Sequence, residues 1–223
     1  MKTIAVVPAY NEETTLSGVL ERLRPYADLC VVVDDGSHDA TAAIARAHGA
    51  VLVRHAINRG LGAALGTGFE TALRLGGEVI VCLDADGQHD PADLPRFVET
   101  LREGADVVIG SRLLDPRGMP MRRRVANWVG NGVTFLLFGA WVTDSQSGYR
   151  GFRREALQQI QIRTNRMEVS SEIIAETRRH RLKLVEIPIE AIYTDYSLSK
   201  GQSFTVGLKT LAKLVMRRLT PRP

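Results

Sequence analysis

Short apolar runs in the first half of the chain alternate with segments whose apolar residues recur every three or four positions. The runs are typical of buried strands and comprise Thr3–Val7, Leu29–Val33, Val51–Val53, Val79–Leu83 and Asp106–Ile109. Helical spacing predicts helices at Leu16 to Leu23, His38 to His48, up to Leu75 and up to about Arg102. The alternation predicts an α/β fold, with helices on both faces of a mostly parallel sheet.

The second half of the chain follows this alternation less closely. Leu113–Met121 holds two prolines and a glycine and predicts a mobile loop, and Thr143–Arg150 reads as a polar loop. Leu184–Ile192 predicts a strand that Pro188 places at an edge of the sheet. Helices are predicted over Arg122–Phe138 and Val169–His180.

Polar clusters follow several of the predicted strands at the point where each strand ends. These clusters are Pro8–Glu12, Asp34–Ser37, Asp84–Gln88 and Gly110–Arg112. Open α/β sheets bind ligands outside the carboxyl ends of their strands. We therefore expect the clusters to converge on one edge of the sheet and to form one site there.

The acid pair directly after Val79–Leu83 is the strongest candidate for chemistry. Asp84 and Asp86 are one residue apart, and neighbouring carboxylates repel each other unless a cation lies between them. A hard divalent ion that bridges carboxylates and diphosphate oxygens would relieve this repulsion, and Gln88 adds a neutral oxygen ligand. A solvated turn is the alternative, because Asp and Gly favour turns. We interpret His89 as a polar surface residue.

Composition and charge narrow the class of partner. The 223 residues suffice for one large α/β domain, and the net charge of +4 with a pI near 9.3 is mildly basic. Such a balance favours phosphates or an anionic membrane as partners, and no nucleic-acid recognition motif occurs. Basic residues concentrate in Arg112–Arg124, Arg150–Arg154, Arg178–Lys183 and Lys209–Arg218.

Three further features concern the cellular environment. Cys30 and Cys82 lie in apolar runs, which predicts free thiols and suits a reducing cytosol. The longest apolar run, Val133–Val142, is ten residues long and too short to span a bilayer. Phe204–Leu219 predicts an amphipathic final helix, which lies either on a membrane surface or against the domain.

Five motifs together resemble a known family. They are Pro8–Glu12, Asp34–Ser37, Asn58–Gly60, Asp84–Asp86 and Asp144–Arg150. In this order they closely resemble the family 2 inverting glycosyltransferases, and the chain is most similar to the dolichyl- and polyprenyl-phosphate mannosyltransferases and glucosyltransferases. The resemblance covers nearly the whole chain and implies a Rossmann-like GT-A fold. We expect a nucleotide-sugar transferase domain over 1–203 and the amphipathic helix over 204–223.

The resemblance also implies roles for individual residues. Catalytic roles fall to Asp84, Asp86 and Arg112. Nucleotide binding falls to Pro8, Tyr10, Glu12, Asp35, Asp84, Ala85 and Lys200. Mg²⁺ or Mn²⁺ would be held by Asp84, Asp86 and Gln88. The acceptor phosphate would contact Arg112, Arg123 and Asn127, with asparagine in place of a serine. The chemistry agrees, since Tyr10 can stack on a nucleobase and the carboxylates of Glu12 and Asp35 can accept hydrogen bonds from base or ribose.

The expected function is the transfer of a hexose from a GDP- or UDP-hexose to a polyprenyl phosphate. The enzyme would lie in the cytoplasm, peripherally on the inner face of the membrane, held by the membrane surface or by a membrane-embedded partner subunit. Transfer to a carbohydrate or lipid hydroxyl is the first alternative, and it would need a general base such as Asp144. A nucleotidyltransferase is the second. Thr194 stands where the lipid-phosphate subgroup often has arginine, which weakens the mannosyl assignment.

Overall fold

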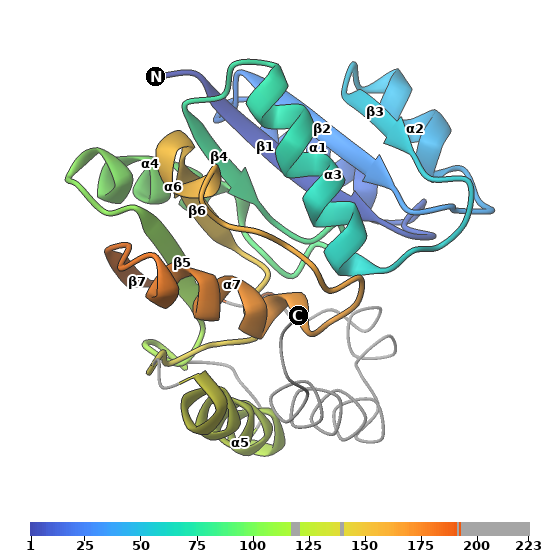
Figure 1. Ribbon diagram of the computed structural model, residues 1–223. Coiled ribbons are helices and arrows are strands. Elements are labelled where there is room, and N and C mark those ends of the chain that lie inside the picture. Colours follow the sequence, from blue (N-terminus) through green and yellow to red (C-terminus); the bar gives the residue numbers. More distant parts are fainter. Residues whose placement is uncertain (117–120, 139–140, 191, 193–223) are drawn as a thin grey trace.

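A seven-stranded sheet is the centre of the computed structural model, which describes residues 1–116, 121–138, 141–190 and 192 (Figure 1). The strands are β1 (Thr3–Ala9), β2 (Leu29–Asp34), β3 (Val51–Arg54), β4 (Val79–Cys82), β5 (Val107–Ser111), β6 (Arg150–Arg153) and β7 (Leu184–Pro188). Their order across the sheet is β3-β2-β1-β4-β6-β5-β7. The predicted α/β class is confirmed.

Strand β6 is the one strand of this sheet that runs against its neighbours. It lies between β4 and β5, and Arg150 pairs with Cys82 on one side and with Ile109 on the other. The other neighbouring pairs are parallel. Because β6 runs in the opposite direction, its first residue lies at the edge where β4 and β5 end. The sequence pattern predicted a polar loop over Thr143–Arg150 and did not predict this strand.

Three helices pack on one face of the sheet. Ala5 and Val7 of β1 point to this face and share a hydrophobic core with the apolar positions that predicted the first helix. A 3-10 turn leads into the last of these helices. The Asp90 carboxylate caps the start of this turn by accepting a hydrogen bond from the Ala92 amide (2.9 Å). The elements on this face are α1 (Leu16–Leu23), α2 (Thr41–Ala47), the turn η1 (Pro91–Asp93) and α4 (Leu94–Arg102).

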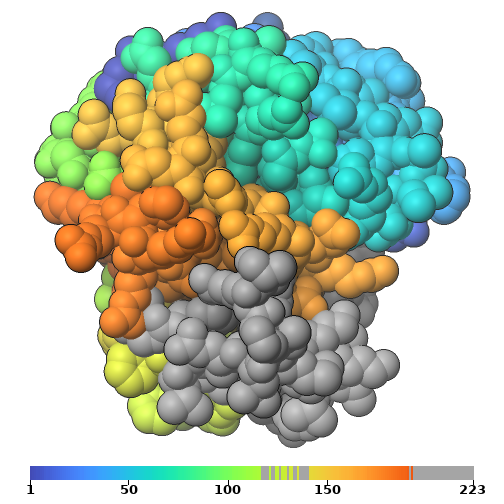
Figure 2. All heavy atoms as spheres, in the orientation of Figure 1, coloured from blue at the N-terminus to red at the C-terminus, as the bar shows by residue number. Residues whose placement is uncertain are grey.

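A second core lies on the opposite face. Ile4 and Val6 of β1 point into it, between the side chains that face the first core. Burial on both faces explains why this strand is a continuous apolar run. The helices on this face are α3 (Leu61–Arg74), α6 (Arg154–Leu157) and α7 (Val169–Arg179), and the chain between the last two completes a continuous cover in Figure 2.

The remaining predictions were confirmed in part. Helix α5 (Met121–Phe138) agrees with the predicted basic helix, and β7 is an edge strand as expected, although it ends at Pro188 and not at Ile192. The predicted helix Phe204–Leu219, the domain boundary before it and residues 117–120 of the predicted loop lie outside the described residues. None of the described helices is long and apolar enough to cross a membrane.

Candidate active site

The edge of the sheet where β1, β2, β4 and β5 end brings the predicted polar clusters together (Figure 1). Ala9 and Asp34 are partners in the register of β1 and β2, so Tyr10 and Asp35 follow adjacent strand ends. Asp84 follows the end of the neighbouring strand β4. The convergence expected from strand–helix alternation is therefore present, and β6 adds the start of an antiparallel strand to it.

Asp84 and Asp86 lie in unlike electrostatic surroundings. Burial opposes ionisation of Asp84, but the bond with His89 and the charges of Arg112 and Arg150 outweigh it, so the pKa of Asp84 lies below its usual value. Burial and the negative charge of Asp84 together raise the pKa of Asp86. The ionised form of Asp84 is thus stabilised, whereas the ionised form of Asp86 is opposed by the negative charge of Asp84. A bound cation would relieve the repulsion between the two carboxylates.

His89 is buried and contacts Asp84 of the acid pair, which corrects its interpretation as a polar surface residue. Its side chain is 2% exposed, and Nε2 lies 3.2 Å from Asp84 Oδ2. The imidazole also packs against Tyr149, with ring centroids 5.3 Å apart. Packing on one side and a hydrogen bond on the other fix the ring, so His89 orients the Asp84 carboxylate.

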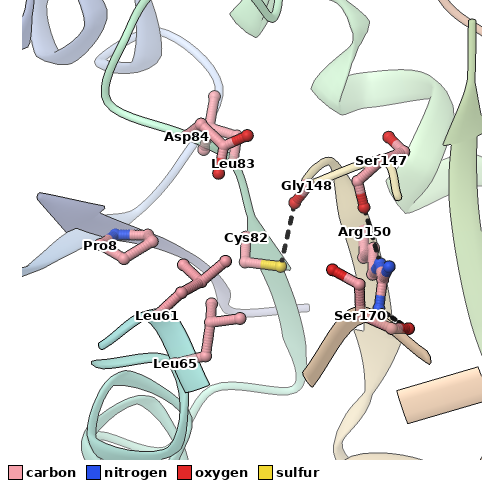
Figure 3. Close-up of a pocket in the computed structure, with 10 residues that line it drawn as sticks. All are labelled: Pro8, Leu61, Leu65, Cys82, Leu83, Asp84, Ser147, Gly148, Arg150 and Ser170. Carbon is pink, nitrogen blue, oxygen red and sulfur yellow. Dashed lines mark hydrogen bonds between the residues drawn. The ribbon is translucent and has the colours of Figure 1, made fainter. Parts of the chain in front are cut away.

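Gly148 and Arg150 line the same cavity as Asp84, as Figure 3 shows. The Gly148 carbonyl accepts a bond from Cys82 Sγ (3.4 Å), and a Cβ atom built on Gly148 would lie only 2.3 Å from Asp84 Oδ2. The buried Arg150 guanidinium donates to the carbonyl oxygens of Ser145, Ser147 and Ser170 at 2.9–3.0 Å. Arg150 therefore holds the loop against Asp84 and places a buried positive charge near it.

The site has the ligand chemistry of a hard divalent cation. Asp84 and Asp86 offer carboxylate oxygens, and the Gln88 side chain lies within hydrogen-bond distance of Asp86. Among the described residues, no group of three or more His, Cys, Asp or Glu side chains is arranged to hold a metal. Mg²⁺ is commonly held by one or two carboxylates together with substrate phosphates. The two carboxylates and one amide fit that pattern.

The residues assigned to the nucleotide lie on both sides of Asp84. Pro8 lines the same cavity as Asp84, and Tyr10 is 40% exposed just beyond β1, which suits a stacking surface. The Glu12 carboxylate accepts a bond from the Thr15 hydroxyl (3.0 Å), and Ala85 is buried in the loop after β4. Lys200 lies outside the described residues. The nucleotide-binding roles of these residues stay predictions.

Asp35 has a local role that the sequence analysis did not assign. Its Oδ1 accepts from the Arg59 amide (2.9 Å) and lies 2.6 Å from His55 Nδ1, while Oδ2 accepts from the Gly60 amide (2.7 Å). His55 is itself held by Thr67 of α3, 3.0 Å from Nε2. Asp35 therefore fixes the loop before α3, and a carboxylate with four lone pairs retains one acceptor position for a ligand.

Arg112 and Asp144 form a bidentate ion pair on the other side of the acid pair. Arg112 Nε donates to Asp144 Oδ2 (2.7 Å) and Nη2 to Oδ1 (2.9 Å), and Asp144 is 0% exposed. Glu186 holds this loop from β7 by accepting bonds from the amide and hydroxyl of Thr143. With both oxygens bonded to one arginine, Asp144 is poorly suited to take a proton from an acceptor.

Helix α5 carries the other two residues assigned to the acceptor phosphate. Arg123 lies in its first turn and Asn127 one turn later, half-buried. One turn further on, Asn131 donates to the Thr143 carbonyl and accepts from the Ser145 amide (2.8 Å). Asn131 thereby ties α5 to the loop that holds Asp144. The contact of Arg123 and Asn127 with a phosphate stays a prediction.

The site residues that the sequence did not single out acquire their roles from the way that separate segments fold together. His55, His89 and Asn131 are single polar residues with no motif of their own. Gly148 and Arg150 belong to the motif Asp144–Arg150 that resembles the family, and that motif is the only sequence signal for them. Their close contacts with Asp84 and with the Ser145–Ser147 loop emerge only in three dimensions.

Comparison with known proteins decides the family. A family model described as glycosyl transferase family 2 matches residues 4–161. The chain belongs to this family. The resemblance noted from the motifs is thus confirmed, and the protein is a family 2 glycosyltransferase. Family membership rules out the nucleotidyltransferase alternative.

Two relatives cover nearly the whole of this glycosyltransferase. A UDP-N-acetylglucosamine–dolichyl-phosphate N-acetylglucosaminyltransferase of Methanococcus voltae is 34% identical over 238 residues, covering 96% of this chain and 95% of the relative. An undecaprenyl-phosphate mannosyltransferase of Micrococcus luteus is 35% identical over 221 residues, covering 93% and 90%. Both names describe transfer to a polyprenyl-type phosphate.

A solved structure shares the fold of the glycosyltransferase. Glucosyl-3-phosphoglycerate synthase of Mycobacterium tuberculosis, in complex with Mn²⁺, UDP and glucosyl-3-phosphoglycerate, superposes with a TM-score of 0.76 at 21% identity. The match covers 99% of this chain and 81% of that one. It confirms the GT-A fold.

Proposed function

We propose that this glycosyltransferase moves a hexose unit, plain or N-acetylated, from a nucleotide-diphosphate sugar to a polyprenyl phosphate, with inversion at the anomeric carbon. A phosphate oxygen of the acceptor forms the new bond to the anomeric carbon. The bond from that carbon to the donor diphosphate breaks, and the nucleoside diphosphate leaves with the bonding electrons. The names of the two full-length relatives support this class of acceptor.

The donor side of the proposal rests on the acid pair and the strand ends beside it. Asp84, Asp86 and Gln88 would hold Mg²⁺ or Mn²⁺, which when bound supplies positive charge for the departing diphosphate. Tyr10, Glu12 and Asp35 would surround the nucleoside, because they follow the ends of β1 and β2 next to Asp84. His89, Gly148 and Arg150 keep the Asp84 carboxylate in place.

The ion pair between Arg112 and Asp144 is the observation that favours a phosphate acceptor. An acceptor hydroxyl needs a general base, whereas a phosphate is already an anion and needs positive charge to hold it. Asp144 was the candidate base, and it is fully buried with both oxygens bonded to Arg112. The pair therefore removes the candidate base and holds Arg112 in a fixed orientation, and Arg123 and Asn127 on α5 are the further proposed contacts of the phosphate.

The same proposal includes the place of action. A polyprenyl phosphate stays in the bilayer, so the enzyme would act as a peripheral protein at the cytosolic membrane face. Contact with the membrane surface or with a membrane-embedded partner subunit would bring the acceptor to the site.

The test is incubation of the purified protein with polyprenyl phosphate, Mg²⁺ or Mn²⁺ and a panel of UDP- and GDP-sugars, followed by mass spectrometry of the lipids. One glycosylated polyprenyl phosphate is expected, and none with Asp86→Ala. The variant should keep its thermal stability, because Asp86 lies in a loop outside the hydrophobic cores. Sugar transfer that proceeds unchanged in Asp86→Ala would contradict the assignment.

A further inference from the structure

Helix α5 turns an apolar face towards solvent, which is the reverse of the usual arrangement for a surface helix. Among its described side chains, the exposed apolar ones are 46–71% exposed and comprise Met121, Val125, Trp128, Val129 and Phe135. At 100° per residue they lie within an arc of about 120° around the helix. They form a continuous stripe, which we call the α5 stripe.

The rotation that exposes the stripe is fixed by polar contacts elsewhere on the helix. Asn131 is 4% exposed and bonds to Thr143 and Ser145, and Arg124 donates to the Pro116 carbonyl. Turning the stripe inwards would break these bonds. In Figure 1 the helix lies below the sheet, away from both hydrophobic cores. The fold itself therefore holds the apolar side chains of the α5 stripe in solvent.

Trp141 extends the stripe beyond the helix. Its ring packs edge-on against Phe135 with centroids 5.5 Å apart, and the side chain remains 60% exposed. The next residue, Val142, is buried and anchors this segment to the domain. Trp128 and Trp141 are the two tryptophans of the whole chain. Exposed tryptophans have an apolar body and a polar N–H, a combination suited to the boundary between lipid and water.

The charge of α5 identifies the chemistry of its partner. Arg122, Arg123 and Arg124 follow one another in its first turn, and the helix contains no acidic residue. Cations at a helix N-terminus oppose the helix dipole, so this arrangement calls for anions from outside the helix. Anionic phospholipid headgroups next to an apolar layer would complement the net positive charge of this helix and its apolar stripe.

We propose that the α5 stripe, together with Trp141, docks this glycosyltransferase on an anionic lipid bilayer. The choice of lipid over another partner rests on the proposed function, because Asn127 and Arg123 of the same helix are the proposed contacts of a lipid-borne phosphate. Docking through α5 would place that side of the active site at the headgroup level. This membrane contact is made by α5 and is separate from any contact made by the predicted helix at Phe204–Leu219.

Tryptophan fluorescence tests the proposal directly, because both tryptophans belong to the docking surface. The full chain is mixed with vesicles of phosphatidylcholine and phosphatidylglycerol, with or without brominated phosphatidylcholine. We expect a blue shift, quenching by the brominated lipid, and weaker binding in high salt. Trp128→Phe and Trp141→Phe each leave one tryptophan, and both remaining signals should be quenched. Absence of quenching in both variants would overturn the proposal.

A matched pair of charge substitutions tests the stripe itself. Val129→Glu should lower the vesicle partition coefficient roughly tenfold or more, since it removes an apolar side chain and adds a repelled charge. Tyr26→Glu adds the same charge at an exposed site outside the stripe and should leave partitioning unchanged. Thermal unfolding checks that both variants fold, and Trp128→Ser provides a second stripe variant. Equal partitioning of the Val129 and Tyr26 variants would contradict the proposal.

Two controls separate the alternatives. Sedimentation velocity without vesicles tests whether the stripe instead binds a second copy of the chain. A dimer that Val129→Glu dissociates, together with absence of quenching by the brominated lipid, would assign the stripe to a second copy and overturn lipid docking. Vesicle docking without formation of any glycolipid would refute the proposed function and leave the docking surface intact. Glycolipid formation in detergent without vesicle docking would refute the docking surface and leave the proposed function intact.

Discussion

At the scale of single residues, the position of one carboxylate depends on three residues outside its motif. His89 bonds to Asp84, Gly148 leaves room for it, and Arg150 holds the loop that contains Gly148. Groups that orient a metal ligand commonly change metal affinity by about 10- to 100-fold when they are removed. The geometry of Asp84 is therefore a property of the folded edge and not of the Asp-x-Asp pattern alone.

Gly148→Ala should weaken metal-dependent binding of a nucleoside diphosphate roughly 10- to 100-fold. The new methyl group would lie 2.3 Å from Asp84 Oδ2 and displace the carboxylate. Gly18→Ala in α1 is the control, because its Cβ would meet nothing within 4 Å. Titration calorimetry with UDP or GDP and Mn²⁺ measures both. Unchanged affinity in the Gly148 variant would show that the carboxylate is not confined as described.

The two thiols should be inert in the native protein. Burial raises the pKa of Cys30 to about 11 and that of Cys82 to about 12. At pH 8 a disulfide reagent should react slowly with the folded chain and rapidly with both thiols in guanidinium. Because the unfolded thiols ionise near pH 9, their contribution to folding stability is full below that pH and is lost as the pH rises towards 11. A thiol that reacts equally fast in both states would contradict the burial.

At the scale of elements, the start of α3 illustrates how a glycine pattern serves packing. The amides of Gly62 and Ala63 donate to the Asn165 carbonyl (2.9 and 3.3 Å), and a Cβ atom on Gly62 would lie 1.9 Å from the Thr164 carbonyl. Gly60 has φ +96°, a conformation that favours glycine. The two glycines let the loop before α7 lie directly on the helix start.

Gly62→Ala should lower the free energy of unfolding by about 1–3 kcal/mol, because the methyl group must push back a peptide carbonyl. Gly66→Ala in the same helix should raise it by about 0.5–1 kcal/mol, since nothing lies within 4 Å of its Cβ and alanine favours helix. Urea unfolding followed by circular dichroism compares the two. A Gly62 variant as stable as the Gly66 variant would refute the close packing.

The elements that sequence predicted well are those in which local pattern and tertiary environment agree. Val79–Leu83 is apolar because β4 is buried on both faces, so the run alone indicates a central strand. Strand β6 was not predicted because it begins with Arg150, a charged residue whose burial depends on bonds to the carbonyl oxygens of Ser145, Ser147 and Ser170. His89 was misinterpreted because it has no motif of its own, and its contact with Tyr149 forms only in the fold.

At the scale of the whole molecule, one edge of the sheet separates two chemically different regions. On one side the ends of β1 and β2 present Tyr10 and Asp35 beside the acid pair. On the other, β5 presents Arg112, and α5 is attached through Asn131 with its arginines and its apolar stripe. The proposed donor region and the proposed acceptor region meet at Asp84. The sequence indicated this asymmetry through the uneven distribution of its basic residues.

The proposed acceptor atom is a phosphate oxygen. This proposal is tested most directly by measuring sugar transfer to a polyprenyl phosphate and to the matching polyprenol, in parallel reactions with the same donor and Mg²⁺. We expect a glycosylated product from the phosphate and none from the alcohol, because Asp144 is bonded to Arg112 and provides no base. Transfer to the alcohol at a comparable rate would contradict the proposal.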